Sequence, residues 1–109
     1  MNFNDYQAQA KTTNTMTDPT IAPMYFILGL AGESGEIAEK VKKVIRNDGG
    51  DYSTLDREDM ARELGDVLWY LSMLADTFGV SLEDVAQKNL AKLADRKDRD
   101  VIRSTGDYR

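Results

Sequence analysis

The chain has 109 residues, of which 41% are hydrophobic, and its 14 Lys and Arg against 19 Asp and Glu give a net charge of −5. This length predicts one domain, and the acidic balance argues against duplex nucleic acid as a partner, because such a partner needs a basic face. The absence of Cys and His excludes disulfides, thiolate or imidazole metal ligands and histidine bases, which leaves carboxylates, Lys and water for proton transfer.

The sequence carries no pattern typical of membrane insertion or secretion. It has no run of about 18 apolar residues, so we expect no membrane partner and no membrane-spanning helix. The first residues lack the basic and then apolar layout of a signal peptide. A cytoplasmic location is therefore the default expectation.

Two helices are predicted in the first half of the chain. The first covers residues 4–11, with Asn4 or Asp5 as its N-cap. Residues 12–23 contain five Thr and both Pro, which indicates a loop and a new helix that starts near the second Pro. This second helix is predicted to run to about Arg46, where a turn rich in Gly and Asn follows.

A third helix is predicted after a short connector. Ser53, Thr54 or Asp56 can cap its start, because their side chains accept hydrogen bonds from free backbone N–H groups. The helix reaches Phe78, and Gly79 is expected to end it.

A fourth helix is predicted over residues 82–95, opened by a capping box of Ser81 and Asp84. No alternating strand pattern is found, so the predicted fold class is all-α. We expect a helical domain at residues 1–96 and a charged C-terminal tail at residues 97–109. The domain would be a bundle of about four helices per chain, completed by oligomerisation.

Two pairs of carboxylates lie three residues apart in the second and third predicted helices, Glu33 with Glu36 and Glu63 with Asp66. Residues i and i+3 share a helix face, so each pair can direct its oxygens to one spot. Four anions beside an apolar stripe repel one another unless a cation lies among them, and Mg²⁺ prefers such oxygen ligands. We interpret the four as ligands of Mg²⁺, with Mn²⁺ as a possible substitute; a solvated helix face is the alternative.

Three glycines, Gly29, Gly32 and Gly35, lie around Glu33 in the second helix. Each costs about 1 kcal/mol of helix stability relative to Ala. We interpret them as positions where another helix or a ligand approaches the backbone closely.

The apolar spacing predicts the core faces of the two long helices. In the second helix the predicted core stripe is Ile27, Leu30, Ala31, Ile37, Ala38, Val41 and Ile45. In the third helix it is Leu64, Val67, Leu71, Leu74 and Phe78. The adjacent row of the third helix is predicted to line a pocket and contains Glu63, Asp66, Tyr70 and Met73. Because two shorter helices cannot cover both stripes, we expect a homodimer or homotetramer.

These residues resemble the motifs of the MazG-like all-α nucleoside triphosphate pyrophosphohydrolases, whose relatives include dimeric dUTPases, dCTP pyrophosphatases and phosphoribosyl-ATP pyrophosphohydrolase. The family pattern is ExxE, a spacer and then ExxD. Here Glu33 and Glu36 form the first motif, and Glu63 and Asp66 form the second after 26 residues. Many members carry a further Glu directly beside the first one; the nearest such candidate here is Glu39.

The resemblance implies Mg²⁺-dependent hydrolysis of a nucleoside or deoxynucleoside triphosphate between its α and β phosphates, giving a monophosphate and pyrophosphate. A housecleaning role in the nucleotide pool would follow. Because the chain has no His, we expect a carboxylate to accept the proton of the attacking water, and Glu36 is our candidate as the more solvated member of its pair. The candidate substrate contacts are Gln7, Lys40, Trp69, Tyr70, Asn89, Lys92 and Arg96.

Several alternatives stay open at this level. Lys40, Lys92 and Arg96 also fit a solvated face with local pairs such as Glu36 with Lys40. Trp69 either packs on the first helix or on another subunit, or stacks on a nucleobase. For the whole chain, the alternatives are phosphoribosyl-ATP hydrolysis and a non-catalytic helical interaction module, which would show no metal dependence.

Overall fold

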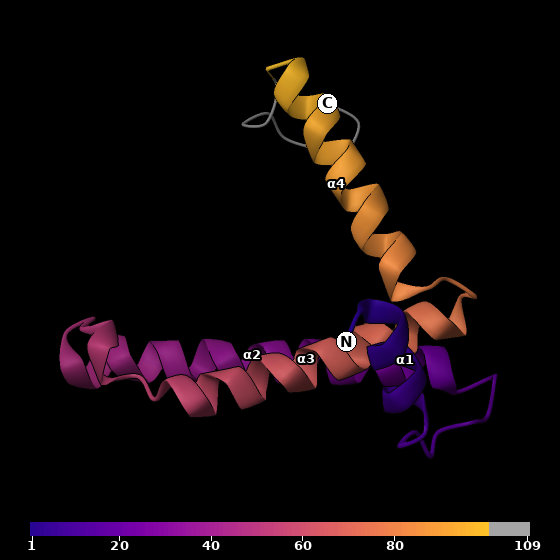
Figure 1. The fold of residues 1–109 in the computed structure, drawn as a ribbon. Coiled ribbons are helices and arrows are strands. Elements are labelled where there is room, and N and C mark those ends of the chain that lie inside the picture. The colour runs from indigo at the N-terminus through magenta and orange to yellow at the C-terminus, as the bar shows by residue number, and fades with distance from the viewer. Residues whose placement is uncertain (101–109) are drawn as a thin grey trace.

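The structure is a computed structural model that describes residues 1–100, and its regular elements are all helical (Figure 1). In chain order they are α1 (Phe3–Lys11), α2 (Ala22–Asp48), the short 3₁₀ helix η1 (Tyr52–Thr54), α3 (Arg57–Thr77) and α4 (Leu82–Asp98). The predicted all-α class is confirmed. Most of the predicted C-terminal tail, residues 101–109, lies outside the described residues. Each helix within residues 1–100 is too short or too polar to cross a lipid bilayer.

The start of α1 differs from the prediction. Its N-cap is Asn2, whose side-chain oxygen accepts a hydrogen bond of 2.8 Å from the backbone N–H of Asp5. The Asp5 carboxylate in turn accepts one of 3.3 Å from the Asn2 N–H. The prediction of Asn4 or Asp5 as the cap was wrong, because this reciprocal capping box satisfies two free donors and lets the helix begin earlier.

The ends of α2 and α3 follow from their local sequence and match the predicted bounds within two residues. Pro23 lies in the first turn of α2, where its missing N–H has no helical partner to lose. Gly49 ends α2 with φ +62°, in the left-handed region that favours glycine. Asp56, one of the three predicted caps of α3, accepts hydrogen bonds from the N–H groups of Glu58 (2.9 Å) and Asp59 (3.2 Å).

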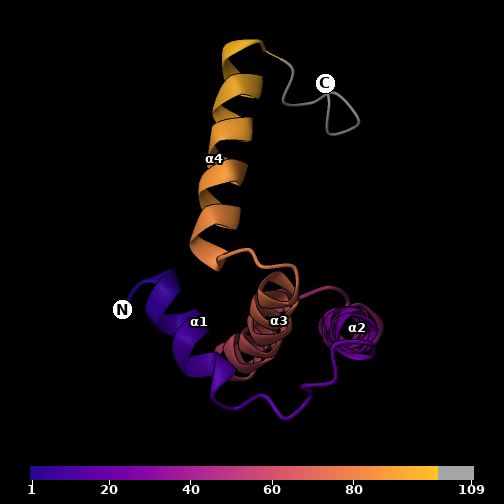
Figure 2. The ribbon, with the colours of Figure 1, turned by 90° about the vertical axis from the view of Figure 1, so that its right-hand side faces the viewer.

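The helices form an open arrangement. The long helices α2 and α3 run antiparallel, and α3 lies between α2 and α1, as the two views show (Figures 1 and 2). Ser81 caps α4 by accepting a 3.0 Å hydrogen bond from the Asp84 N–H, and α4 runs three residues beyond its predicted end. This helix contacts α1 and α3 but not α2, and it projects away from the pair. The radius of gyration is 16.9 Å, whereas a compact chain of this length has about 13 Å.

The hydrophobic core lies where α1, α3 and the start of α2 meet. Its buried members are Ala10, Ala22, Phe26 and Met73. Packed against them are Tyr6, Met16, Trp69, Tyr70 and Leu74. Met73, which belongs to the row predicted to line a pocket, is a core residue at 1% exposure, and its flexible side chain suits that position. The core is therefore concentrated at one end of the α2–α3 pair.

The predicted core stripes of the two long helices are covered only in part. Leu74 packs against the core and Val67 is half-buried, but several other members are exposed. Leu64 and Phe78 of α3 are 55% and 65% exposed, and Ile27 and Ile45 of α2 are also exposed. The reason is that both helices turn the neighbouring row, which contains Met73 in α3, toward each other. An amphipathic pattern marks apolar faces but does not say which of them the same chain covers. The exposed members of the two stripes therefore lie on the surface of the chain.

Candidate metal centre

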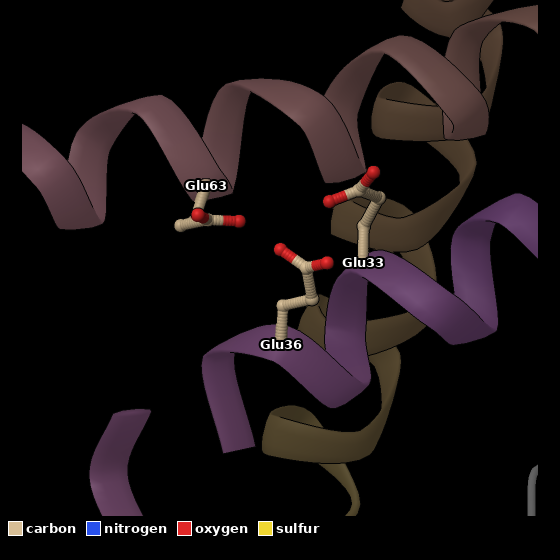
Figure 3. A group of neighbouring side chains, drawn as sticks. All are labelled: Glu33, Glu36 and Glu63. Carbon is tan, nitrogen blue, oxygen red and sulfur yellow. The ribbon is translucent and has the colours of Figure 1, made fainter. Parts of the chain in front are cut away.

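The contact between α2 and α3 brings three of the four predicted carboxylates together (Figure 3). Glu33 and Glu36 come from α2 and Glu63 comes from α3, and one oxygen of each lies within 4.8 Å of the others. We call these three residues the acid group. Asp66, one turn further along α3, is exposed and is not among the three. Its charge still acts on the group, because it is one of the influences that raise the pKa of Glu33.

The electrostatics of the acid group are those of crowded anions. Burial is the largest cause that raises the pKa of the Glu33 carboxyl, followed by the charges of Glu36, Asp66 and Glu63. Both causes penalise the ionised form, since desolvation and like charges disfavour an anion. A cation within the group would favour the ionised form and so offset both effects.

Glu63 provides the observation that points most directly to such a cation. Its side chain is 14% exposed, and its Oε1 lies 3.1 Å from the Nζ of Lys40. Its Oε2 is buried and has no hydrogen-bond partner among the described residues. An unpaired buried carboxylate oxygen is costly unless it binds an ion, and a site with only oxygen donors suits Mg²⁺ or Mn²⁺. The residues present therefore fit a hard divalent metal.

Lys40 does not form the predicted pair with Glu36 on its own helix. It reaches across to α3 instead and pairs with both Asp59 and Glu63. Hydrogen bonds to these two carboxylates, first that to Asp59, raise the pKa of Lys40. Glu39, the predicted candidate for a fifth carboxylate, pairs with Lys42 at 2.9 Å, outside the acid group.

Tyr70 lies beside the acid group because of a missing side chain on α2. Three of its ring atoms lie 2.1 to 2.5 Å from the place where a Cβ on Gly29 would be. The predicted close approach to the glycines is confirmed at Gly29, whereas a Cβ at Gly32 or Gly35 would meet nothing within 4 Å. Burial is the largest cause that raises the pKa of Tyr70, and the charge of Glu33 is among the others.

Trp69 and Gln7, two of the predicted substrate contacts, are engaged within the fold. Trp69 packs against Phe26 with ring centroids 6.0 Å apart, and its Nε1 donates a 2.9 Å hydrogen bond to the Oγ1 of Thr13, just after α1. This matches the packing alternative. Gln7 is buried, and its amide is held by the backbone.

The Gln7 amide joins three elements of the fold. Its Nε2 donates to the carbonyl oxygens of Ser72 (3.1 Å) and Val80 (3.4 Å), and its Oε1 accepts from the N–H of Leu82 (2.9 Å). These bonds tie α1 to α3 and to the start of α4. They favour a structural role, and substrate contact by Gln7 stays a prediction.

The remaining predicted contacts, Asn89, Lys92 and Arg96, lie on α4. Because α4 does not contact α2, the structure does not bring them to the acid group of the same chain (Figure 1). Asn89 and Lys92 line a shallow pocket of their own with Val85 and Lys88. Their part in substrate binding stays a prediction.

The sequence reasoning missed Asp59 as a neighbour of the site. Asp59 and Glu63 are four residues apart, and this spacing places them on one face of α3. That signal was available, but Asp59 lies outside the ExxD pattern and directly after the helix start, where acidic residues are common for another reason. The register between α2 and α3 is what makes it a partner of Lys40.

Comparison with known proteins agrees with this geometry. The model of the MazG nucleotide pyrophosphohydrolase domain matches residues 23–101, a range that contains the whole acid group. The chain is similar to the Gene 37 protein of Mycobacterium phage L5, with 51% identity over 85 residues, 78% of this chain and 75% of the phage protein. It is also similar to the uncharacterized protein YvdC of Bacillus subtilis (strain 168), with 38% identity over 72 residues, 62% of this chain and 68% of that protein.

Neither name states an activity, and no solved structure gives a significant match. The family match covers well over half of the chain and supports nucleotide pyrophosphohydrolase activity in general. The chain belongs to the MazG nucleotide pyrophosphohydrolase domain family.

Proposed function

We propose that this chain hydrolyses a nucleoside or deoxynucleoside triphosphate between the α and β phosphates in a Mg²⁺-dependent reaction, as a housecleaning enzyme of the nucleotide pool. One observation carries the proposal. Glu33, Glu36 and Glu63 converge between α2 and α3, and one oxygen of Glu63 is buried there without a partner. A cytoplasmic location stays a prediction from the sequence.

Glu33, Glu36 and Glu63 would hold the metal, and we propose that Asp66, whose charge also acts on Glu33, joins them. When bound, Mg²⁺ supplies positive charge to phosphate oxygens and lowers the pKa of a water molecule, and Mn²⁺ can substitute for it. Glu36 is the exposed member of the group, so it is the carboxylate that can exchange a proton with solvent. We assign it the role of proton acceptor.

Positive charge for the leaving pyrophosphate has a nearby source. Lys40 and Lys43 line a shallow pocket together with Glu36 and Glu39. A phosphate chain that extends from the acid group into this pocket would meet both ammonium groups. Tyr70, on whose hydroxyl the charge of Glu33 acts, is our proposed contact for the sugar or the α phosphate.

We further propose that the enzyme is a homodimer or homotetramer. The accessible surface is 7928 Å², whereas a compact monomer of 12.2 kDa has about 6,100 Å². The excess is larger than the roughly 800 Å² that each partner of a standard interface buries. A second copy that covers the open stripes would also bring its α4, with Asn89, Lys92 and Arg96, within reach of this acid group.

The decisive experiment is a panel of common ribonucleoside and deoxyribonucleoside triphosphates together with phosphoribosyl-ATP, assayed with and without Mg²⁺. We expect monophosphate and pyrophosphate from at least one nucleoside triphosphate, and only with metal. Release of orthophosphate would contradict the cleavage position. Hydrolysis of phosphoribosyl-ATP alone would support the alternative that the chain is a phosphoribosyl-ATP pyrophosphohydrolase. If no compound of the panel is hydrolysed either with or without Mg²⁺, the result would support a non-catalytic interaction module.

Two measurements without turnover complete the test. Calorimetry should detect Mg²⁺ or Mn²⁺ binding in the low-millimolar range or tighter, and the melting temperature should rise with metal, because the ion relieves repulsion that exists only in the folded state. Sedimentation at micromolar concentration should give a species larger than 12.2 kDa. A monomer that still turns over substrate would refute the shared-site arrangement.

A further inference from the structure

Lys40 connects the acid group to a carboxylate that the proposed chemistry does not use. It leaves α2 and ends between Asp59 and Glu63 of α3, with its Nζ 3.1 Å from Glu63 Oε1. Its side chain is only 29% exposed, and that of Asp59 is 38% exposed. The three residues form a short chain of alternating charge from the protein surface to the acid group.

Glu63 would bind two cations at once, the Lys40 ammonium group and the metal ion. One of its oxygens is occupied by Lys40, and the other is buried without a partner in the acid group. A divalent ion held by Glu63 is therefore a close neighbour of the Lys40 ammonium group, because both bind the same carboxylate. The two cations repel each other across it.

Two effects of Lys40 on metal binding oppose each other. The ion pair holds the Glu63 side chain in place, and the entropy saved in this way favours a metal by at most about thirtyfold in binding constant. The repulsion between a unit charge and a divalent ion a few ångströms away disfavours the metal by roughly tenfold even at the dielectric constant of water, and by far more at lower values. Since the site is half-buried, the repulsion is the larger effect.

We infer that Lys40 is the resident counter-ion of the metal site, which neutralises Glu63 in the metal-free protein and keeps the metal affinity of that form low. Metal then enters together with an anionic triphosphate, because the substrate's negative charge offsets the Lys40 charge. Asp59 shares the Lys40 ammonium group with Glu63 and so limits how strongly Lys40 binds Glu63. This inference rests on the proposed function and gives Lys40 a second role beside its phosphate contact, because Lys40 then sets the order in which metal and substrate bind.

The test is calorimetric titration of the nucleotide-free full chain with Mn²⁺. Lys40→Met should bind Mn²⁺ about tenfold more tightly than the unchanged protein, because it removes the repulsion and leaves the Asp59 charge uncompensated. Lys42→Met is the matched control: it removes the same charge from the same helix, at a side chain that is 62% exposed and pairs with Glu39 outside the acid group. Its Mn²⁺ affinity should stay within about twofold.

A second variant tests the same inference by changing a partner of Lys40 and leaving Lys40 itself in place. Asp59→Asn frees Lys40 from its second partner, so Lys40 should bind Glu63 more strongly and weaken Mn²⁺ binding severalfold. Lys40→Met should also lower the melting temperature without metal, and Mn²⁺ should restore it.

The outcomes separate the two proposals. Mn²⁺ affinity in Lys40→Met that is equal to or weaker than that of the unchanged protein would overturn the counter-ion inference, as would tighter binding in Asp59→Asn. The Asp59→Asn result decides the matter if Lys40→Met does not fold. Absence of Mn²⁺ binding in both the unchanged protein and Lys40→Met would instead overturn the proposed function.

Discussion

The helices α2 and α3 are held together in two different ways. Near α1 they pack through apolar side chains, whereas further along the pair they are joined by ion pairs. In the apolar region near α1, Phe26 and Met73 are 2% and 1% exposed. In the charged region, the side chains of Lys40 and Glu63 are partly exposed. The free energy of such an ion pair depends on solvent, salt and bound ions. Fold stability and ligand response therefore belong to different stretches of the same two helices, and substitutions should separate them.

Removal of charge from the middle should have the largest effect on activity. Glu36→Gln and Glu63→Gln each delete a proposed metal ligand with little change of volume. We expect turnover to fall on the order of a thousandfold in both, while the metal-free melting temperature changes little. Steady-state assays and thermal scans measure the two quantities. Glu58→Gln, an exposed carboxylate in the first turn of α3, is the control and should keep its activity; full activity in Glu63→Gln would exclude the site.

Truncation at the apolar end should have the opposite signature. Met73→Ala leaves a cavity in the core and should lower the free energy of unfolding by about 2 to 5 kcal/mol, as measured by urea denaturation. Mn²⁺ affinity below the unfolding transition should not change. Leu64→Ala, in the exposed stripe, should cost less than about 1 kcal/mol at low protein concentration. A similar loss in both variants at every concentration would show that the stripe is covered within one chain.

Gly29→Ala should test how tightly α3 packs on α2 between the apolar region and the acid group. Ala favours a helix over Gly by about 1 kcal/mol, but its Cβ would lie 2.1 Å from a ring atom of Tyr70. We expect a net loss of about 1 to 2 kcal/mol in unfolding free energy, because the ring must move. Gly32→Ala meets nothing within 4 Å and should gain up to about 1 kcal/mol. Equal stabilisation by the two substitutions would contradict the Tyr70 contact.

The smallest predicted effect lies in the connector before α3, where neither burial nor the acid group acts. The side-chain and backbone hydrogen bonds of Ser53 hold the pKa of Asp51 below its ordinary value of 3.8. A lowered pKa in the folded state means that this stabilisation is present above the ordinary pKa and is lost as the pH falls through the folded value. Ser53→Ala removes the side-chain hydrogen bond and keeps the backbone one, so it should move the pKa part of the way back up, which NMR titration of the Asp51 carboxyl can measure. An unchanged pKa would exclude the side-chain hydrogen bond as a cause.

The sequence was sufficient for the helices and for most of the acid group. Capping residues, glycines and prolines act locally, and the i, i+3 spacing orients Glu33 with Glu36 whatever the rest of the fold does. The convergence of Glu63 with that pair followed from treating both motifs as one site. The helix bounds and the spacing within each motif depend on near neighbours in the chain, whereas the convergence of Glu63 depends on how α3 packs against α2.

The contacts between helices could not be predicted in the same way. Leu64 has the spacing of a core residue, but the neighbouring row of α3 faces α2, so Leu64 is exposed. Lys40 has a carboxylate four residues before it, but it pairs across the interface with Asp59. Both outcomes depend on the rotation and register of one helix against another, which a single amphipathic pattern does not contain.

The fit of the Tyr70 ring over Gly29 also fixes how far α3 can slide along α2. One helical turn advances the chain by about 5.4 Å. A slip by that amount would carry Glu63 away from Glu33 and Glu36, whose ligand oxygens now lie within 4.8 Å of its own. Gly29, one helical turn before Glu33, thus fixes the register of α3 against α2 through its contact with Tyr70. It keeps the two carboxylate motifs aligned without taking part in the chemistry itself.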